Sequence, residues 1–96
     1  MKTILLGPGG QLGTDIQAVN LKQGEPLSIS PVGRAVIDLT DFDATSSFLR
    51  NQNFSCLINC SSYHKTDEVE KNAQLAFTIN AHLVQKLAEI LSLIHI

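Results

Sequence analysis

The feature that most constrains this sequence is a glycine-rich segment lying between two apolar stretches of different periodicity. Residues 2–6 form a short aliphatic run typical of a β-strand, and residues 11–22 repeat apolar side chains at helical spacing. The glycine-rich segment reads Gly7-Pro8-Gly9-Gly10-Gln11-Leu12-Gly13, and its last three residues are also the first three of the helical stretch. The segment therefore predicts a strand, a tight glycine turn and a helix in direct succession.

Three glycines of this segment have separate physical uses. Gly7 permits the tight turn, Gly10 lets the backbone approach a pyrophosphate, and Gly13 lets the helix lie close to the strand. The N-terminus of the helix adds free N–H groups and a partial positive charge. The spacing differs from the G-x-G-x-x-G of many dehydrogenases, although Gly9 adds a further small residue. A glycine turn that binds nothing is the alternative, but the strand–turn–helix context favours a dinucleotide site.

The rest of the chain alternates β-prone runs with helical segments. We expect these further elements: strands over residues 27–30, 35–38 and 55–60, a helix over residues 43–51 with Asp41 as its N-cap, and a long helix over residues 70–90. The run that ends at Cys60 is apolar almost throughout, which is typical of a central parallel strand. The order predicts an α/β fold, the N-terminal portion of a three-layer, doubly wound parallel sheet.

Composition excludes several classes of protein. The 96 residues are enough for one domain or a piece of one, and with 44% hydrophobic and 17% charged residues they do not resemble a disordered chain. No apolar run approaches the roughly 18 residues of a membrane span. The net charge of -2, without a basic cluster, gives no reason to expect nucleic acid or a membrane as partner. The N-terminal apolar run is too short for a signal peptide, so we expect a cytoplasmic protein that binds a small molecule.

The cysteines and histidines predict neither a disulfide nor a metal site. Cys56 and Cys60 lie on one predicted strand, about 13 Å apart at ~3.3 Å per residue, beyond the ~7 Å that a disulfide allows. We expect both to be small buried residues in a reducing compartment. His64, His82 and His95 are scattered, with no spacing typical of metal ligands.

Three segments together resemble one enzyme family. Residues 7–13 are similar to the nucleotide loop of extended short-chain dehydrogenase/reductases, and Asp38-Leu39-Thr40-Asp41 is similar to a segment found after the second strand in one branch of them. Residues 58–70 read Ile-Asn-Cys-Ser-Ser-Tyr-His-Lys-Thr-Asp-Glu-Val-Glu. This resembles the Asn-Ala-Ala-Ala-Tyr/His-Thr-x-Val-Asp-x-Ala-Glu signature of dTDP-4-dehydrorhamnose reductases, and Ile79-Asn80-Ala81 follows at that family's distance. The resemblance covers residues 2–90.

The resemblance implies an NAD(P)-binding Rossmann fold and a set of cofactor contacts. Those residues are the loop residues Gly7, Gly10, Gln11, Leu12 and Gly13 at the pyrophosphate, Asp38 and Leu39 beside the adenine, Ser61, Ser62 and Tyr63 at the nicotinamide-side ribose, and Asn80 on the long helix. An ordinary buried amide is the alternative for Asn80. Asp67 and Glu70 are read as stabilising the start of the long helix.

Departures from the family pattern bear on the choice of cofactor, NADPH or NADH. Ser30 stands at the predicted strand end, where many relatives have an acidic residue for the ribose hydroxyls. Arg34 is near enough in sequence to pair with a 2′-phosphate, so NADPH is favoured over NADH. A solvated loop arginine is the alternative. Polar residues, Cys60, Ser61 and Ser62, also replace three alanines of the signature.

The family that the chain resembles reduces the C4 keto group of dTDP-4-dehydro-L-rhamnose to dTDP-L-rhamnose, which is used in surface polysaccharides. Its proton donor is the tyrosine of a Tyr-x-x-x-Lys motif, but the single tyrosine here, Tyr63, is followed four residues later by Asp67. We therefore expect no catalytic residue in this chain. We expect it to be an inactive fragment of an enzyme that, when full length, takes a dTDP-sugar and forms a homodimer. Two alternatives remain: a non-catalytic regulatory subunit like that of methionine adenosyltransferase, or a sugar-nucleotide epimerase or dehydratase.

The last six residues form a separate question. Residues 91–96 read Leu-Ser-Leu-Ile-His-Ile, which resembles the translation of a sequencing adaptor. We expect residues 1–90 to be a truncated cofactor domain and residues 91–96 to be non-native. The alternative is that the long helix simply continues to the end.

Overall fold

The computed structural model describes residues 2–61 and 78–94, with the backbone alone at residues 78 and 79. The chain divides into two compact units. Residues 1–37 and 52–61 make the first, which holds β1 (Lys2–Leu6), α1 (Gln11–Lys22), β2 (Ser28–Val32) and β3 (Cys56–Asn59). Residues 38–51 and 62–96 make the second, which holds α2 (Phe42–Arg50), η1 (Thr78–His82) and α5 (Leu83–Leu93).

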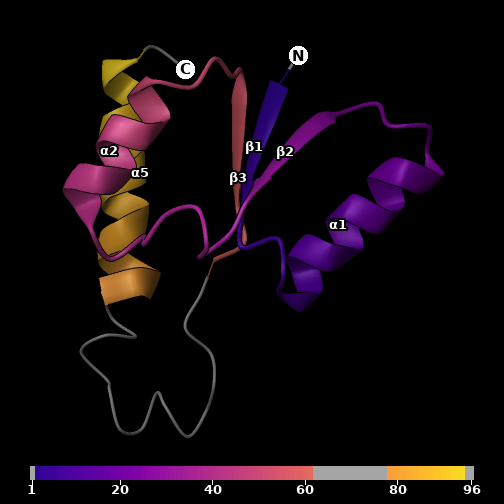
Figure 1. Ribbon diagram of the computed structural model, residues 1–96, viewed down its shortest axis with the longest axis horizontal. Coiled ribbons are helices and arrows are strands. Elements are labelled where there is room, and N and C mark those ends of the chain that lie inside the picture. Colours follow the sequence, from indigo (N-terminus) through magenta and orange to yellow (C-terminus); the bar gives the residue numbers. More distant parts are fainter. Residues whose placement is uncertain (1, 62–77, 95–96) are drawn as a thin grey trace, which may run out of the picture. The chain divides into compact units, whose positions relative to one another are not determined.

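The strands form one parallel sheet in the order β2-β1-β3, with all three arrows pointing the same way in Figure 1. β1 is the central strand, and its last residue, Leu6, pairs with Val32 on one side and Asn59 on the other. The side chains of Ile4 and Leu5 are fully buried. The aliphatic run after Lys2 thus supplies the centre of the sheet, and the predicted parallel pairing of β1 with β3 is confirmed.

β2 differs from its prediction at its carboxyl end. The strand continues through Pro31 to Val32 instead of ending at Ser30. A proline is tolerated on an edge strand, because some backbone N–H groups of such a strand face solvent and have no partner strand to donate to. The predicted strand over residues 35–38 is wrong. The chain turns there instead, with the Val36 N–H donating to the Gly33 carbonyl at 3.0 Å, and only Ile37 of that apolar run is buried.

β3 is shorter than predicted and lies at the other edge of the described sheet. Its expected central position is therefore wrong for the described strands. The expected burial of Cys56 is also wrong, because this residue begins the edge strand and is exposed, whereas Cys60 is half-buried. Both cysteines are free thiols.

α1 begins and ends at the predicted residues and is tied to β2 through one side chain. The Asn20 carboxamide donates to the Leu27 carbonyl at 2.9 Å and accepts from the Leu27 N–H at 3.0 Å. Between them the chain reverses through Gly24 and Glu25, both of which have positive φ, at 82° and 57°. This reversal brings β2 beside β1.

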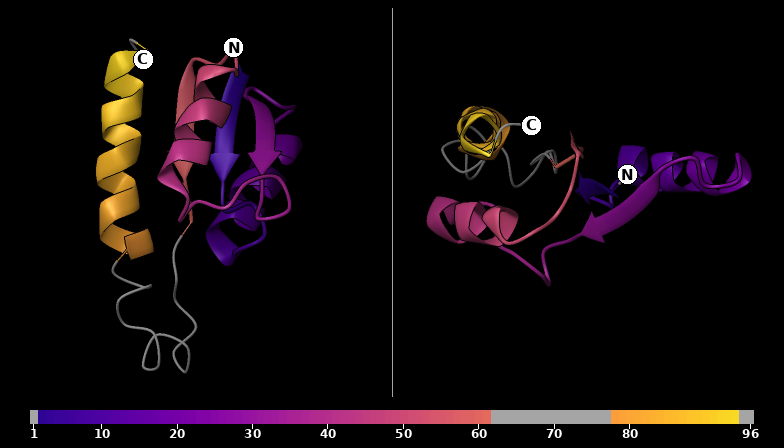
Figure 2. Two further views of the ribbon diagram at one scale, coloured as in Figure 1. Left: turned by 60° about the vertical axis from the view of Figure 1, so that its left-hand side comes forward. Right: turned by 90° about the horizontal axis from the view of Figure 1, so that it is seen from above.

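In the second unit, α2 begins at Phe42 and ends at Arg50, each one residue earlier than predicted, and the predicted N-cap is confirmed. The Asp41 carboxylate accepts from the Ala44 N–H at 3.0 Å, which is an N-cap bond. The buried residues of α2 are Thr45 and Leu49, whereas Ala44 is exposed. α2 contacts α5, and the right-hand view of Figure 2 shows α5 end-on beside α2.

The long C-terminal helix is described from residue 78 onward. Its first described turn, η1, is a π-helix and not the expected α-helix, in a stretch of β-branched and amide residues with weak α-helical propensity. In α5, the side chains of Leu83, Leu87 and Ile90 are buried, and their spacing of four and three residues places them on one face of the helix. The helix continues to Leu93, and a domain boundary at residue 90 stays a prediction. No helix in the described part of the chain is long and apolar enough to cross a membrane.

The N-cap of α2 gives a direct test of this part of the fold. Replacing Asp41 with alanine removes the acceptor for the Ala44 N–H, and we expect the free energy of unfolding to fall by about 1 kcal/mol. Urea unfolding followed by circular dichroism measures the change. Asp15→Ala on α1 is the matched control, since it also removes one exposed carboxylate. An equal loss in both variants would contradict the capping role of Asp41.

Candidate functional site

The carboxyl ends of the three parallel strands gather at one edge of the sheet in the first unit. β1 leads into Gly7, β2 into Gly33, and β3 into Cys60. The strand order reverses at β1, since the chain passes first to β2 and then back to β3 on the other side. In open parallel sheets, ligands bind in the crevice outside such a reversal, beyond the carboxyl ends of the strands.

Gly7 lies where the loops that follow β1 and β3 meet. Its φ is +74°, and a Cβ atom there would lie 2.6 Å from both the Cys60 carbonyl carbon and the Ser61 nitrogen. The Cys60 N–H donates to the Leu6 carbonyl at 2.9 Å, which continues the pairing of the strands past their ends. Only glycine fits, because both the backbone conformation and the space exclude a side chain.

Gly13 sets the approach of α1 to this loop. A Cβ atom at Gly13 would overlap the Gly7 carbonyl oxygen and lie 2.9 Å from the Pro8 Cα atom. The helix therefore begins directly against the turn, and its N-terminus is directed at the same edge of the sheet. In Figure 1, a short loop leads from the end of β1 to the start of α1, which lies below it and to the right.

The other two glycines face open space. A Cβ atom at Gly9 would meet nothing within 4 Å, and one at Gly10 only the Gly7 carbonyl oxygen at 3.9 Å. Gly10 is the N-cap of α1 and offers no side-chain cap, and the first turn carries no acidic residue. The first bond of the helix runs from the Thr14 N–H to the Gly10 carbonyl at 2.9 Å. The N–H groups of the first turn thus lie beside a space that an anion can enter.

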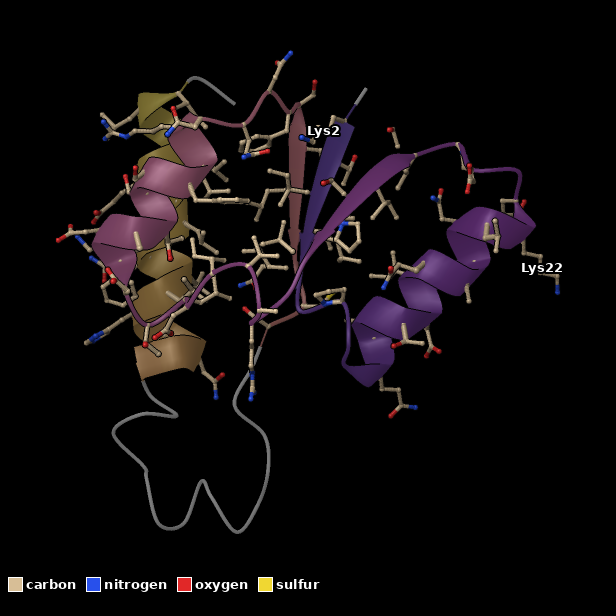
Figure 3. The ribbon with its side chains drawn as sticks, in the orientation of Figure 1. Lys2 and Lys22 are labelled. Carbon is tan, nitrogen blue, oxygen red and sulfur yellow. The ribbon has the colours of Figure 1, made fainter. Side chains whose placement is uncertain are left out.

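Two predicted contact residues, Gln11 and Leu12, belong to this first turn. Both side chains are exposed, and Leu12 keeps 61% of its surface accessible. Figure 3 shows that the two labelled lysines lie away from the glycine loop: Lys2 is at the amino end of β1, and Lys22 is at the far end of α1. The positive potential at the loop therefore comes from the backbone and not from these two lysines.

Hydrogen bonds that the sequence did not reveal hold the loops in shape. The Gln17 carboxamide donates to the Pro8 and Gly13 carbonyls, each at 3.0 Å. The Asn59 carboxamide oxygen accepts from the Ser61 N–H at 3.0 Å and also from the Ser61 hydroxyl. An asparagine at a strand end is a known turn signal that could have identified Asn59, but nothing local identifies Gln17.

The predictions for the ribose side are only partly placed. Ser61 lies beside Gly7 at the sheet edge, whereas Ser62, Tyr63, Asp67 and Glu70 fall outside the described residues. Asn80 belongs to η1 in the second unit, where its side chain is exposed and not buried as the alternative interpretation held.

The placement of Ser30 corrects the sequence analysis. Ser30 pairs with Ile4 in the middle of β2, so it is not at the carboxyl end of the strand. That end is occupied by Val32, and the turn that follows contains Gly33 and the exposed Arg34. A Cβ atom at Gly33 would lie 3.8 Å from the Pro8 Cγ atom, so this turn adjoins the glycine loop.

Asp38 and Leu39 open the second unit, and their backbone leads into α2. The Asp38 carboxylate accepts from the Thr40 hydroxyl at 2.6 Å and from the Thr40 N–H at 2.9 Å. These bonds, the hydroxyl bond foremost, hold the pKa of Asp38 below its ordinary value. The Asp41 N–H donates to the Asp38 carbonyl at 3.1 Å. Asp38 thus orders the start of α2, whatever it also does toward an adenine.

No arrangement among the described residues suggests metal chemistry. Within residues 2–61 and 78–94, no three histidine, cysteine, aspartate or glutamate side chains come together in a way that could hold a metal ion. What the described site can do is bind: it offers backbone N–H groups and open space at the sheet edge.

Alanine substitutions at the two glycines with positive φ in the first unit distinguish the cost of backbone strain from the cost of steric overlap. Gly24 also has positive φ, but a Cβ atom there would meet nothing within 4 Å. We expect Gly24→Ala to lower the free energy of unfolding by about 1–2 kcal/mol through backbone strain alone. For Gly7→Ala we expect a further loss of about 1–3 kcal/mol from overlap with residues 60 and 61. Urea unfolding of both variants measures this, and equal losses would show that the contact is unimportant.

Comparison with known proteins shows that this chain is similar to a group of enzymes. A dTDP-4-dehydrorhamnose reductase of Mycobacterium tuberculosis is 30% identical over 87 residues, which are 91% of this chain and 27% of the relative. The dTDP-4-dehydrorhamnose reductase structure from Clostridium acetobutylicum superimposes with a TM-score of 0.83 at 29% identity, over 96% of this chain and 32% of that one. The Bacillus anthracis enzyme, solved in complex with NADP, gives a TM-score of 0.80 at 29% identity, over 98% of this chain and 33% of that one.

The chain thus spans about a third of the length of these relatives. The expected α/β Rossmann fold with a parallel sheet is confirmed, and so is the resemblance read from the sequence. The family described as the RmlD substrate binding domain matches residues 1–96. This chain belongs to that family.

Proposed function

We propose that this chain is the NADPH-binding part of a dTDP-4-dehydrorhamnose reductase. The observation that carries the proposal is the uncapped N-terminus of α1 at Gly10, which faces open space at the carboxyl edge of the sheet. A pyrophosphate fits this arrangement because it needs several N–H donors and a close approach to the backbone. The NADP complex of the Bacillus anthracis relative, at 29% identity, supports the choice of ligand.

We propose the following residues as those that would hold the cofactor. Gly7 and Gly13 shape the loop, and the N–H groups from Gly10 to Leu12 would meet the pyrophosphate. Arg34, exposed just beyond the end of β2, would pair with the 2′-phosphate, and residues 31–34 at this strand end include no carboxylate to oppose it. The remaining contacts we propose are those of Asp38 and Leu39 with the adenine, and of Ser61, Ser62, Tyr63 and Asn80 on the nicotinamide side.

The reaction proposed for the intact protein is the reduction of the C4 keto group of dTDP-4-dehydro-L-rhamnose. A bound NADPH supplies the hydride. The residues of this chain bind and orient, but they donate no proton, because the sequence holds a single tyrosine, Tyr63, and lacks the Tyr-x-x-x-Lys motif. We further propose that the intact protein works in the cytoplasm, in the supply of rhamnose for polysaccharides, and that it forms a homodimer.

The open space at Gly10 predicts how the site can be blocked. Gly10 has φ of -78° and ψ of 174°, an extended conformation that valine also adopts, so Gly10→Val leaves the backbone unstrained. Its side chain would occupy the pyrophosphate position, and we expect the dissociation constant for NADPH to rise at least about tenfold. Titration calorimetry with NADPH and with NADH measures it, and the wild type should bind NADPH more tightly.

Gln23→Val is the matched control, since it places the same side chain at the exposed opposite end of α1. We expect this variant to bind NADPH like the wild type, and urea unfolding should show that all three proteins are folded. If Gly10→Val and the wild type bind NADPH equally well, the loop is not the pyrophosphate site.

The proposed activity can be tested in a chimera. Residues 1–90 would replace the matching first third of the Bacillus anthracis enzyme, with which the chain superimposes at a TM-score of 0.80. We expect the chimera to oxidise NADPH when dTDP-4-dehydro-L-rhamnose is added, and the chain alone to oxidise none above background. A chimera that binds NADPH but leaves this substrate unreduced would count against the reductase assignment. Turnover by the chain alone would show that its catalytic residues have been overlooked.

A further inference from the structure

The Pro8 carbonyl oxygen receives two hydrogen bonds from side chains of α1. The Gln17 Nε2 group donates to it at 3.0 Å, and the Thr14 hydroxyl donates to it at 3.3 Å. The same Nε2 group also donates to the Gly13 carbonyl at 3.0 Å. Gln17 is half-buried whereas Thr14 is exposed, so the bond from the glutamine is both the shorter and the less exposed of the two. One side chain thus ties the glycine loop to the helix that follows it.

This bond fixes the orientation of one peptide group. The Pro8–Gly9 peptide is trans, so its carbonyl and its N–H point in opposite directions. Since the carbonyl is turned toward Gln17 and Thr14, the Gly9 N–H is turned away from them. No residue in the described part of the chain accepts a hydrogen bond from it. A Cβ atom at Gly9 would meet nothing within 4 Å, so this stretch of backbone borders open space.

Without the glutamine, the loop sequence prefers another conformation. Pro8 and Gly9 form a turn, and a proline followed by a glycine favours a type II turn, in which the glycine has positive φ. Gly9 is not among the residues with positive φ, so the turn is not of type II. Type I and type II turns differ by rotation of their central peptide, which here joins Pro8 to Gly9. The bond from Gln17 therefore opposes the local preference of the sequence.

We propose that Gln17 is a positioning residue for the pyrophosphate: its carboxamide holds the Pro8–Gly9 peptide so that the Gly9 N–H is presented beside the open N-terminus of α1. This inference rests on the proposed function, because it assumes that a dinucleotide binds at the loop. Gln17 itself touches no ligand and acts through the backbone. A glutamine suits the task since its amide group has two hydrogens, one for each carbonyl, whereas a carboxylate has none.

The test compares Gln17→Leu with Gln23→Leu, the same change at the exposed C-cap of α1. Two measurements are made on each protein and on the wild type: NADPH affinity by calorimetry, and the heteronuclear NOE of the Gly9 and Gly10 amides without ligand. For Gln17→Leu we expect about tenfold weaker NADPH binding, since one ordering hydrogen bond is worth about that factor, and a lower NOE at Gly9. We expect Gln23→Leu to match the wild type in both.

Further outcomes separate this inference from the proposed function. If Gln17→Leu unfolds, Gln17→Glu replaces it, because the carboxylate keeps the shape but cannot donate, and it should show the same loss and the same mobile Gly9. Wild-type affinity or an unchanged Gly9 NOE in a folded Gln17 variant would overturn the positioning role, while loss of binding in Gly10→Val would still uphold the dinucleotide site. Absence of NADPH binding by the wild type would overturn both.

Discussion

The close approach of Gly7 to the backbone of Cys60 and Ser61 is the constraint on which the rest of the first unit depends. A Cβ atom added at residue 7 would lie only 2.6 Å from those backbone atoms. The loops after β1 and β3 can therefore meet only because the residue is glycine. The meeting places the turn at the reversal of strand order, and Gly13 then brings the start of α1 against the same turn. The open space that we propose a ligand enters lies beside these contacts, at Gly9 and Gly10, where added Cβ atoms would touch almost nothing.

The glycines of the loop therefore divide by the physical demand at each position. Gly7 and Gly13 are required by the fold, since a side chain at either would overlap the backbone. The fold leaves room for a side chain at Gly9 and at Gly10, so the packing of the described residues does not require glycine at either position. Gln17 links the two pairs, because it bonds to the carbonyls of Pro8 and Gly13 together. Folding and binding thus depend on different atoms of one short loop.

Local signals predicted the parts of this structure that are decided locally. β1, α1 and the Asp41 cap of α2 follow from an aliphatic run, a glycine turn and a capping side chain, and all three were predicted correctly. The errors concern pairing and exposure. Pro31 can be a strand residue because β2 lies at an edge of the described sheet, and Cys56 is exposed because β3 lies at the other edge. The neighbouring residues in the sequence do not reveal which strands are at the edges. The bonds of Gln17 depend on how a helix meets a turn, which periodicity does not reveal.

The proposed recognition of a pyrophosphate through backbone groups also indicates where a cofactor preference would arise. The N-terminus of a helix attracts any phosphate with about half a unit charge, so it treats the pyrophosphates of NADH and NADPH alike. Lys2 and Lys22 lie away from the loop and cannot distinguish them. NADPH differs from NADH by its 2′-phosphate, and under the proposed function that phosphate would lie at the end of β2, so discrimination would need a charge there. In the described part of the chain that place is held by Arg34, exposed beside a turn that adjoins Pro8, and not by Ser30, which lies within the strand.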